Sequence, residues 1–468
     1  MQKFAPSHVG KATALRLAIR RGVTEAILQA QDELPSTRRA AAALQMARNS
    51  VIEAYEGLQA EGVIETRRGA RPRVCDLPDL QPKRGQRQTA IALSKRGKIL
   101  SDDHRKGYIT GNVDAFAPGL PDPSLFSLDN WAVCLRRAAR HSRGPRDLYD
   151  EFQGLSILRK ALALHLKRAR GVSVSPEQVF ILPCTQSALA LMSELVTDPG
   201  DRVMMEDPCY AGGKALFHAQ GLETTPLCDD LTTAASPNLA KLIYVTPSTQ
   251  YPMGTRMKLA RRLDILAFAE ANNALIFEDD YDGDFVWRGA DVPPLFSLDK
   301  ASTVALLGTA SKSLIPAMRL GWLIVPPNLV DPVRRAHRTL GFGVNAHVQA
   351  AMAEFITSGH FARHVRTAAR VYQERMICLT DALHDSLGDE MYVSRPDGGL
   401  QVTVKFDDHV DDLAVKDELW ARGIHVLALS TLCIQSHARG LVMGFSRANP
   451  KTSQHLARAI RDALGKLS

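Results

Sequence analysis

VALLGTASKSLIPAMRLG, residues 304–321, is the stretch of this 468-residue sequence that says most about the fold. It begins as an apolar run that favours a buried strand, and it continues through small residues to Lys312 and, seven positions later, Arg319. Small and apolar neighbours can lower the pKa of a lysine by excluding water, and a neutral amine is the form that attacks an aldehyde. Arg319 is available to bind a phosphate group. The stretch therefore indicates a buried strand that leads into a reactive lysine.

Short apolar runs of the same kind alternate with helical stretches on both sides of Lys312. Helical periodicity extends over residues 154–169 and 257–272. The apolar runs are residues 179–182, 202–205, 242–245, 275–277, 303–306 and 321–325. This alternation predicts an α/β domain over residues 113–468 with a largely parallel sheet, whose ligands bind at the carboxyl ends of the strands.

Two other apolar runs lead directly into residues suited to binding a charged ligand. Residues 275–277 are followed by the acidic cluster EDDYD, residues 278–282, where a buried carboxylate is costly unless it has a cationic partner. Residues 179–182 are followed by PCTQSA and a helix, and the free N–H groups of a helix N-terminus bind anions. The carboxyl ends of several strands are therefore expected to form one site.

The basic excess of the chain lies in its N-terminal part. Residues 1–110 contain 20 Lys and Arg against 11 Asp and Glu, whereas the rest of the chain contains 38 against 39. A localised basic region of this kind is typical of a DNA-binding module, although a solvated basic face is an equally simple explanation of charge alone.

Periodicity in this N-terminal part predicts a winged helix-turn-helix domain over residues 1–76. Helices are expected over residues 14–31, 36–44 and 48–61, and a basic hairpin, or wing, over residues 63–74. Such a domain places polar residues of its second paired helix in the major groove and its wing on the phosphate backbone. The candidate DNA-binding residues are Arg38, Arg48, Asn49, Ser50, Arg67 and Arg68. Residues 77–112 lack sustained periodicity and are expected to form a linker.

Residues 34–69, LPSTRRAAAALQMARNSVIEAYEGLQAEGVIETRRG, resemble the winged helix-turn-helix of GntR-type bacterial regulators. Gln45-Met46 stands where that family usually has Gly-Val in the turn, and the usual end of the wing is missing. These differences concern the preferred DNA sequence more than the fold. The resemblance implies that double-stranded operator DNA is a partner.

The remainder of the chain is similar to fold-type I aminotransferases, which bind pyridoxal 5'-phosphate, and the whole chain resembles the MocR subfamily of GntR-type regulators. The resemblance implies an aminotransferase-like domain with a largely parallel sheet and a smaller C-terminal subdomain. It is carried by the segments YDEFQG (149–154), EDPCY (206–210), VTPSTQYPMG (245–254), EDDYD (278–282) and SKSLIPAMRLG (311–321).

The resemblance also implies a role for individual residues. Lys312 would form the aldimine (Schiff base) with the cofactor, and Asp279 would pair with its pyridine nitrogen. Tyr281, with Gln250, would bind the phenolic oxygen, and Tyr210 would stack on the ring. Tyr149 would reach the phosphate of the neighbouring subunit in a homodimer. The residues implied in binding the phosphate of the same subunit are Thr185, Gln186, Thr309, Ser311 and Arg319.

Two departures from the family pattern concern the effector. Ala211-Gly212-Gly213 follows Tyr210, where some members have an arginine for a ligand carboxylate, and Thr249 replaces a histidine. Arg439, just before an expected strand at 441–445, is the candidate carboxylate contact.

The function implied is a pyridoxal-phosphate-dependent transcriptional regulator that senses an amine or amino acid, or pyridoxal phosphate itself. A catalytically active aminotransferase remains an alternative, because the same residues serve both functions. No long apolar run indicates a signal peptide or a membrane span, so a cytoplasmic protein is expected. The seven cysteines are scattered without a C-x-x-C pair and predict no metal site.

Overall fold

The computed structural model divides into two compact units, Met1–Ala92 and Leu93–Ser468, each described here by itself. Within the expected linker, residues 95–101 form a short helix, α4 (Lys95–Ser101), which packs against α8 (Ala211–Ala219) of the larger unit. The other linker residues, apart from 91–94, lie outside the part of the chain that is described. The described residues are 10–67, 70–76, 91–101, 114–140, 152–227, 231, 240–286, 292–388 and 391–467.

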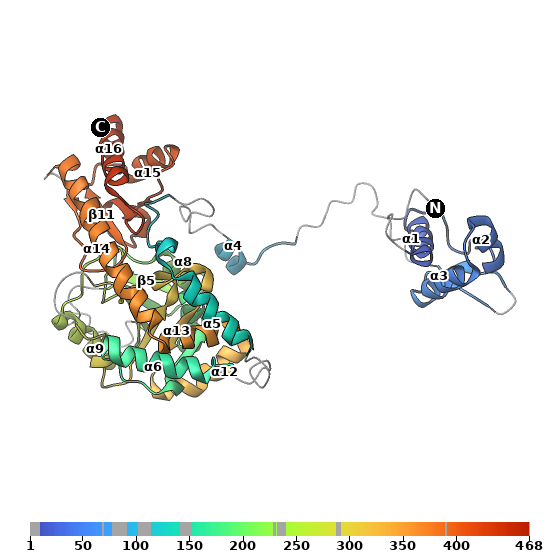
Figure 1. Ribbon diagram of the computed structural model, residues 1–468, viewed down its shortest axis with the longest axis horizontal. Helices are drawn as coiled ribbons and strands as arrows, with labels where there is room; N and C mark the ends of the chain where they lie inside the picture. The colour runs from blue at the N-terminus through green and yellow to red at the C-terminus, as the bar shows by residue number, and fades with distance from the viewer. Residues whose placement is uncertain are drawn as a thin grey trace. The chain divides into compact units, whose positions relative to one another are not determined.

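The smaller unit has the expected three helices and hairpin (Figure 1): α1 (Lys11–Thr24), α2 (Thr37–Leu44), α3 (Arg48–Ala60), β1 (Ile64–Glu65) and β2 (Arg73–Val74). Ser36 caps α2, because its Oγ accepts a hydrogen bond from the backbone N–H of Arg39 at 3.4 Å. Val51, Tyr55 and Leu58 of α3 are buried on one face, as the spacing predicts.

The smaller unit has two local features that the periodicity did not predict: an early end of α1 and a left-handed residue in the turn after α2. The first helix ends at Thr24 and not near Gln31, because the backbone N–H groups of Ile27 and Leu28 both return to the carbonyl of Gly22. Gln45, in the turn between α2 and α3, has a φ of 50°. This left-handed conformation costs a non-glycine residue about 1 kcal/mol, which explains why glycine suits this position.

The larger unit is built on a seven-stranded sheet with the order β3-β9-β8-β7-β6-β4-β5. The five strands from β8 to β5 are parallel, and β9 runs antiparallel to both of its neighbours. The predicted, largely parallel sheet is therefore confirmed. Its strands are β3 (Val179–Leu182), β4 (Arg202–Met205), β5 (Glu223–Pro226), β6 (Leu242–Val245), β7 (Leu275–Asp279), β8 (Val304–Thr309) and β9 (Gly321–Ile324).

Helices cover the sheet and bury its apolar side chains. Phe180 and Phe277 pack in one core cluster with Leu189 of α7, whereas Ile243 and Ile276 pack in another with Ile265 of α9. The α-helices of this part are α5 (Leu128–Arg140), α6 (Ser156–Arg170), α7 (Thr185–Val196), α8, α9 (Leu259–Asn272), α10 (Leu295–Leu298), α11 (Ala310–Ser313), α12 (Val330–Leu340) and α13 (Ala346–Thr357).

A smaller C-terminal subdomain follows, as expected. The long helix α14 connects it to the rest of the unit (Figure 1), and its four-stranded sheet has the order β10-β11-β13-β12. Its elements are α14 (His360–Leu387), β10 (Tyr392–Val393), β11 (Gln401–Phe406), α15 (Asp412–Ala421), β12 (Leu427–Ala428), β13 (Arg439–Gly444) and α16 (Pro450–Leu467).

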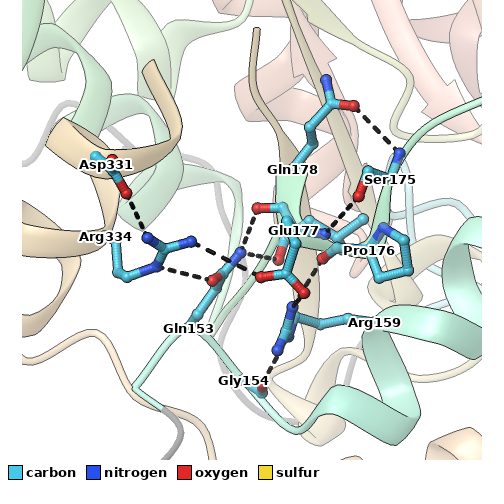
Figure 2. A network of polar contacts seen from close by, with 10 residues as sticks. Gln153, Gly154, Arg159, Ser175, Pro176, Glu177, Gln178, Asp331 and Arg334 are labelled. Carbon is cyan, nitrogen blue, oxygen red and sulfur yellow. Dashed lines mark hydrogen bonds and ion pairs between the residues drawn. The ribbon is translucent and has the colours of Figure 1, made fainter. Parts of the chain in front are cut away.

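A polar network fastens residues 153–154 to the edge strand β3 (Figure 2). The Gln153 side chain donates to the carbonyls of Glu177 and Val179 at 2.7 and 3.0 Å and accepts from Arg334 at 3.2 Å. The backbone carbonyl of Gln153 accepts a hydrogen bond from the backbone N–H of Ile181 in β3 at 2.9 Å. The segment therefore covers an edge strand whose backbone groups would otherwise be unpaired.

A membrane-spanning helix would need to be long and mostly apolar. Among the described residues, no helix meets both conditions.

Candidate functional site

A cavity of about 340 Å³ lies at the carboxyl ends of the parallel strands, where ligands of open α/β sheets bind. It is lined by residues at or just after the carboxyl ends of five strands, β3, β4, β6, β7 and β8, together with Pro118 and Gly119. The predicted site residues that line it are Thr185, Gln186, Tyr210, Asp279, Tyr281, Thr309, Ser311, Lys312 and Arg319.

Lys312 lies on α11, the short helix that follows β8. Its Nζ donates a hydrogen bond to the carbonyl oxygen of Gly119 at 2.6 Å. Burial lowers the pKa of Lys312, although the nearby Asp282 and Asp279 oppose that shift. The lowered pKa increases the fraction of neutral amine, which is the nucleophilic form.

Asp279 ends β7 and is buried. Its Oδ2 accepts a hydrogen bond from the hydroxyl of Tyr244 at 2.7 Å, whereas its buried Oδ1 has no hydrogen-bond partner among the described residues. Burial raises the pKa of Asp279 to about 7, while Tyr244 and Lys312 act in the opposite direction. An acceptor oxygen is thus left for a donor that enters the cavity.

Tyr281 is held by polar groups from two parts of the unit. Its hydroxyl donates to the carbonyl of Thr249 at 3.2 Å and accepts from Nε2 of Gln401 at 3.3 Å. Gln401 begins β11, so the C-terminal subdomain contributes directly to the wall of the cavity. Burial, together with the nearby Asp282, raises the pKa of Tyr281, so its hydroxyl stays protonated.

Another group of lining residues suits an anion. The helix α7 begins there with Thr185 and Gln186, and Arg319 also lines the cavity. Burial raises the pKa of the Cys184 thiol, but a hydrogen bond from Ser187 and the charge of Arg319 bring it below its usual value. Helix N–H groups and a guanidinium are the groups that bind phosphate in proteins.

Tyr210 precedes α8 and packs edge-to-face on Tyr251, with 6.2 Å between the ring centroids. Its ring lies so close to Gly212 that a Cβ at that position would come within 2.5 Å of Cζ. A larger residue at 212 would displace the tyrosine from the cavity wall.

Three other predicted residues are not among those lining the cavity. Gln250 lies nearby, but its amide donates to Glu206 at 2.7 Å and accepts from Thr255 at 3.0 Å. Arg439, the candidate carboxylate contact, begins β13 and forms an ion pair with Asp412 at 3.5 Å. Tyr149 lies outside the described residues.

The candidate DNA-binding residues of the smaller unit lie on its helices and hairpin. Arg48 and Asn49 are exposed in the first turn of α3, where Ser50 is half-buried, and Arg38 is exposed near the start of α2. Arg67 follows β1, is exposed and pairs with Glu65 at 3.5 Å. Arg68 lies outside the described residues.

Several residues of the cavity were not singled out from the sequence. They include Tyr244, Tyr251, Thr246, Cys184 and Gln401. Cys184 and Tyr251 lie inside segments that were recognised, so their proximity to the site was available from the sequence. Tyr244 and Gln401 lie within strands, where a side chain's direction depends on which face of the sheet is covered.

Comparisons with known proteins agree with this architecture. The family model described as aminotransferase class I and II matches residues 122–460. The probable rhizopine catabolism regulatory protein MocR of Rhizobium meliloti is 34% identical over 447 residues, 93% of this chain and 90% of the relative. The HTH-type pyridoxine biosynthesis transcriptional regulator PdxR of Corynebacterium glutamicum is 32% identical over 457 residues, 97% of this chain and 95% of the relative.

Among solved structures, an archaeal alanine:glyoxylate aminotransferase superposes with a TM-score of 0.70 and 25% identity, covering 80% of this chain and 96% of that one. The chain is thus similar to aminotransferases over most of its larger unit. It is similar to transcriptional regulators over nearly its whole length.

Proposed function

Because this chain belongs to the MocR subfamily of GntR-type helix-turn-helix transcriptional regulators, with a domain of the aminotransferase class I and II family, we propose that it regulates transcription in response to an amine bound at Lys312 through pyridoxal phosphate. The proposal depends on one observation: Lys312, Asp279 and Arg319 line the same cavity. Asp279 ends β7, Lys312 follows β8 and Arg319 precedes β9, so three adjacent strands bring an anion, an amine and a cation to one cavity.

The chemistry of the cavity fits pyridoxal phosphate. The free Oδ1 of Asp279 is an acceptor for a protonated ring nitrogen, and Arg319 with the start of α7 suits the phosphate. The lowered pKa of Lys312 suits its attack on an aldehyde. When bound, the cofactor supplies an aldehyde carbon that links covalently to an amine, and a ring that withdraws electrons.

The remaining residues position the cofactor in this proposal. Tyr281 would turn its hydroxyl from the Thr249 carbonyl to the phenolic oxygen, and Tyr210 would stack on the ring. Thr185, Gln186, Thr309 and Ser311 would bind the phosphate together with Arg319. Tyr149 would reach the phosphate of the neighbouring subunit, which requires a homodimer.

The proposed effector is a compound with a primary amine, because the aldehyde selects for that group. Arg439 is engaged with Asp412, so it does not support recognition of a carboxylate in this cavity. Two alternatives are tested at the same site: a response to pyridoxal phosphate but to no amine would make the cofactor the effector, and sustained turnover with a keto acid would make the protein an aminotransferase.

We expect Lys312→Ala to abolish covalent attachment of the cofactor. Borohydride reduces the bond between a lysine and pyridoxal phosphate, so intact-mass measurement after reduction should find a single adduct on the wild-type chain and none on the variant. Lys300→Ala is the control: it removes an exposed lysine in the loop between α10 and β8, and the variant should form as much adduct as the wild type. An equal adduct on Lys312→Ala would refute the assignment.

The response to an effector is measured on the same proteins. Absorbance titration with amines, amino acids and sulfonates should identify compounds that change the wild-type spectrum, and a DNA-mobility assay should find that they also change operator binding. A DNA response to pyridoxal phosphate without any response to amines would favour a cofactor sensor. Multiple turnovers with a keto acid at ordinary enzyme rates would favour an aminotransferase.

Arg48→Ala and Asn49→Ala should each weaken binding to the operator by about 1–3 kcal/mol if these side chains contact base edges. Both side chains are exposed in the first turn of α3, the helix expected in the major groove. The loss on random duplex DNA should be smaller, since binding there depends on phosphate contacts.

Arg21→Ala provides the control, because Arg21 lies on α1 and pairs with Glu25. It should leave the ratio of operator to random-DNA affinity unchanged. Losses of equal size on operator and random DNA would reduce Arg48 and Asn49 to backbone contacts.

A further inference from the structure

We propose that Tyr244 is a positioning residue for the cofactor: it holds Asp279 so that the bound pyridine ring, and not the carboxyl group, carries the proton they share. This inference rests on the proposed function, because the ring is that of pyridoxal phosphate. It assigns a role to a residue that no segment of family resemblance singled out.

The register of two adjacent strands places Tyr244 beside Asp279. Tyr244 of β6 pairs with Phe277 of β7 in the parallel ladder, and Asp279 follows Phe277 by two residues. Side chains two positions apart point to the same face of a sheet, and a long side chain reaches its diagonal neighbour. The Tyr244 hydroxyl therefore meets Oδ2 of Asp279, at 2.7 Å.

Packing fixes the tyrosine in this position. Tyr244 is 2% exposed, and its ring packs edge-to-face on Phe217 of α8, with 6.4 Å between the centroids. Burial and the neighbouring carboxylate raise the pKa of Tyr244, so the phenol keeps its proton at all physiological pH values. It can therefore act towards Asp279 only as a donor.

The two oxygens of Asp279 consequently have different roles. Oδ2 is occupied by Tyr244, and the buried Oδ1 of this cavity-lining residue has no partner among the described residues. Around the carboxyl group, Asp280 disfavours ionisation, whereas Lys312 and Tyr244 favour it. Within this set, Tyr244 is the group whose hydrogen bond stabilises the ionised carboxylate.

The consequence for a bound ring follows from competition for one proton. A proton between Oδ1 and the ring nitrogen resides on the stronger base. A hydrogen bond to Oδ2 makes the carboxylate a weaker base, which leaves the proton on nitrogen. A protonated nitrogen is what allows the ring to withdraw electrons. Loss of the phenol is expected to move the proton towards Asp279.

Tyr244→Phe tests this inference, because it removes one oxygen and keeps the ring. The full-length protein is loaded with pyridoxal phosphate labelled with ¹⁵N in the ring, and the nitrogen chemical shift is measured by solid-state NMR. In the variant the shift should move towards that of an unprotonated pyridine. Cofactor affinity should also fall, because the carboxyl group then holds its proton more tightly and offers less negative charge to the ring nitrogen.

Tyr372→Phe is the matched control. Tyr372 is equally buried, but its hydroxyl accepts from the backbone N–H of Asp122 at 2.8 Å, outside the cavity lining. It should leave the nitrogen shift unchanged. If Tyr244→Phe does not fold, incorporation of 3,5-difluorotyrosine at position 244 provides a second test, because a more acidic phenol is a stronger donor and should move the proton further towards nitrogen.

The outcomes separate this inference from the proposed function. A wild-type protein that forms no covalent adduct at Lys312 would remove the basis of both. A wild-type protein that binds the cofactor, with the same nitrogen shift in wild type and Tyr244→Phe, would overturn the role of Tyr244 and leave the proposed function standing.

Discussion

Asp279→Asn is expected to stabilise the cofactor-free protein at pH 8 and to weaken its binding of pyridoxal phosphate. Burial raises the pKa of Asp279 to about 7, whereas an unfolded aspartate has a pKa of about 4. The folded protein therefore binds this proton more tightly, and the resulting stability is present below pH 4 and is lost as the pH rises to about 7. Asparagine avoids that loss because it does not ionise.

The gain from Asp279→Asn should be about 2–3 kcal/mol larger at pH 8 than at pH 5, on the basis of this shift. Urea unfolding of the larger unit at the two pH values measures the difference, and comparison between them cancels effects that do not depend on pH. Asp264→Asn changes an exposed carboxylate of α9 and should show no such gain. A gain that is the same at both pH values would contradict the assigned pKa.

Asp279→Asn should weaken cofactor binding even though it stabilises the cofactor-free protein. Asparagine cannot supply a charge to a protonated ring nitrogen, so the affinity for pyridoxal phosphate should fall about 10–100-fold. A residue that lowers stability when the site is empty and raises affinity when it is filled is typical of binding sites.

The positions of Lys312 and Asp279 could be predicted because both follow apolar runs that proved to be adjacent parallel strands. β7 and β8 pair in register from Ile276 and Val304 onwards, so their carboxyl ends meet. The rule that ligands bind at this edge of a sheet then brings the two residues together without knowledge of the tertiary structure.

Tyr244 and Gln401 could not be predicted in the same way. Tyr244 lies within the apolar run LIYV, where an aromatic residue is compatible with ordinary core packing. Gln401 belongs to a different sheet and reaches Tyr281 only through the packing of the C-terminal subdomain. Gly119 contributes a backbone carbonyl, for which the sequence holds no side-chain pattern.

Gln250 and Arg439 show how a local environment can redirect a plausible side chain. The backbone of Gln250 pairs with Thr255 in a tight loop, and its side-chain amide donates to the half-buried Glu206. Arg439 lies beside Asp412, whose carboxylate already accepts from Ser430 and Gly440. In both cases a carboxylate elsewhere in the sequence, half-buried in Glu206 and fully buried in Asp412, binds the predicted residue, and the sequence alone does not reveal that pairing.

Arg262→Met is expected to destabilise the larger unit by about 3–5 kcal/mol, the cost of breaking a buried charge pair. Arg262 and Glu278 are both fully buried, with 3.8 Å between Nη1 and Oε1. The guanidinium also donates to three loop carbonyls, at 2.6 Å to Pro247, 3.0 Å to Pro293 and 3.1 Å to Met257. Methionine fills the space but leaves these acceptors and the carboxylate without the cation.

The pH dependence distinguishes the loss of charge from a packing defect. Burial and the nearby Asp280 raise the pKa of Glu278 to about 7, and Arg262 acts against that shift. Without the guanidinium the pKa rises further, so the variant should lose more stability than the wild type as the pH increases from 5 to 8. Adding Glu278→Gln should restore part of the stability at pH 8, because glutamine carries no charge; its amide oxygen keeps one of the two acceptors that Leu295 and Phe296 use in the carboxylate. Urea unfolding of the single and double variants measures both effects, and a loss that is independent of pH and of Glu278 would assign the cost to packing.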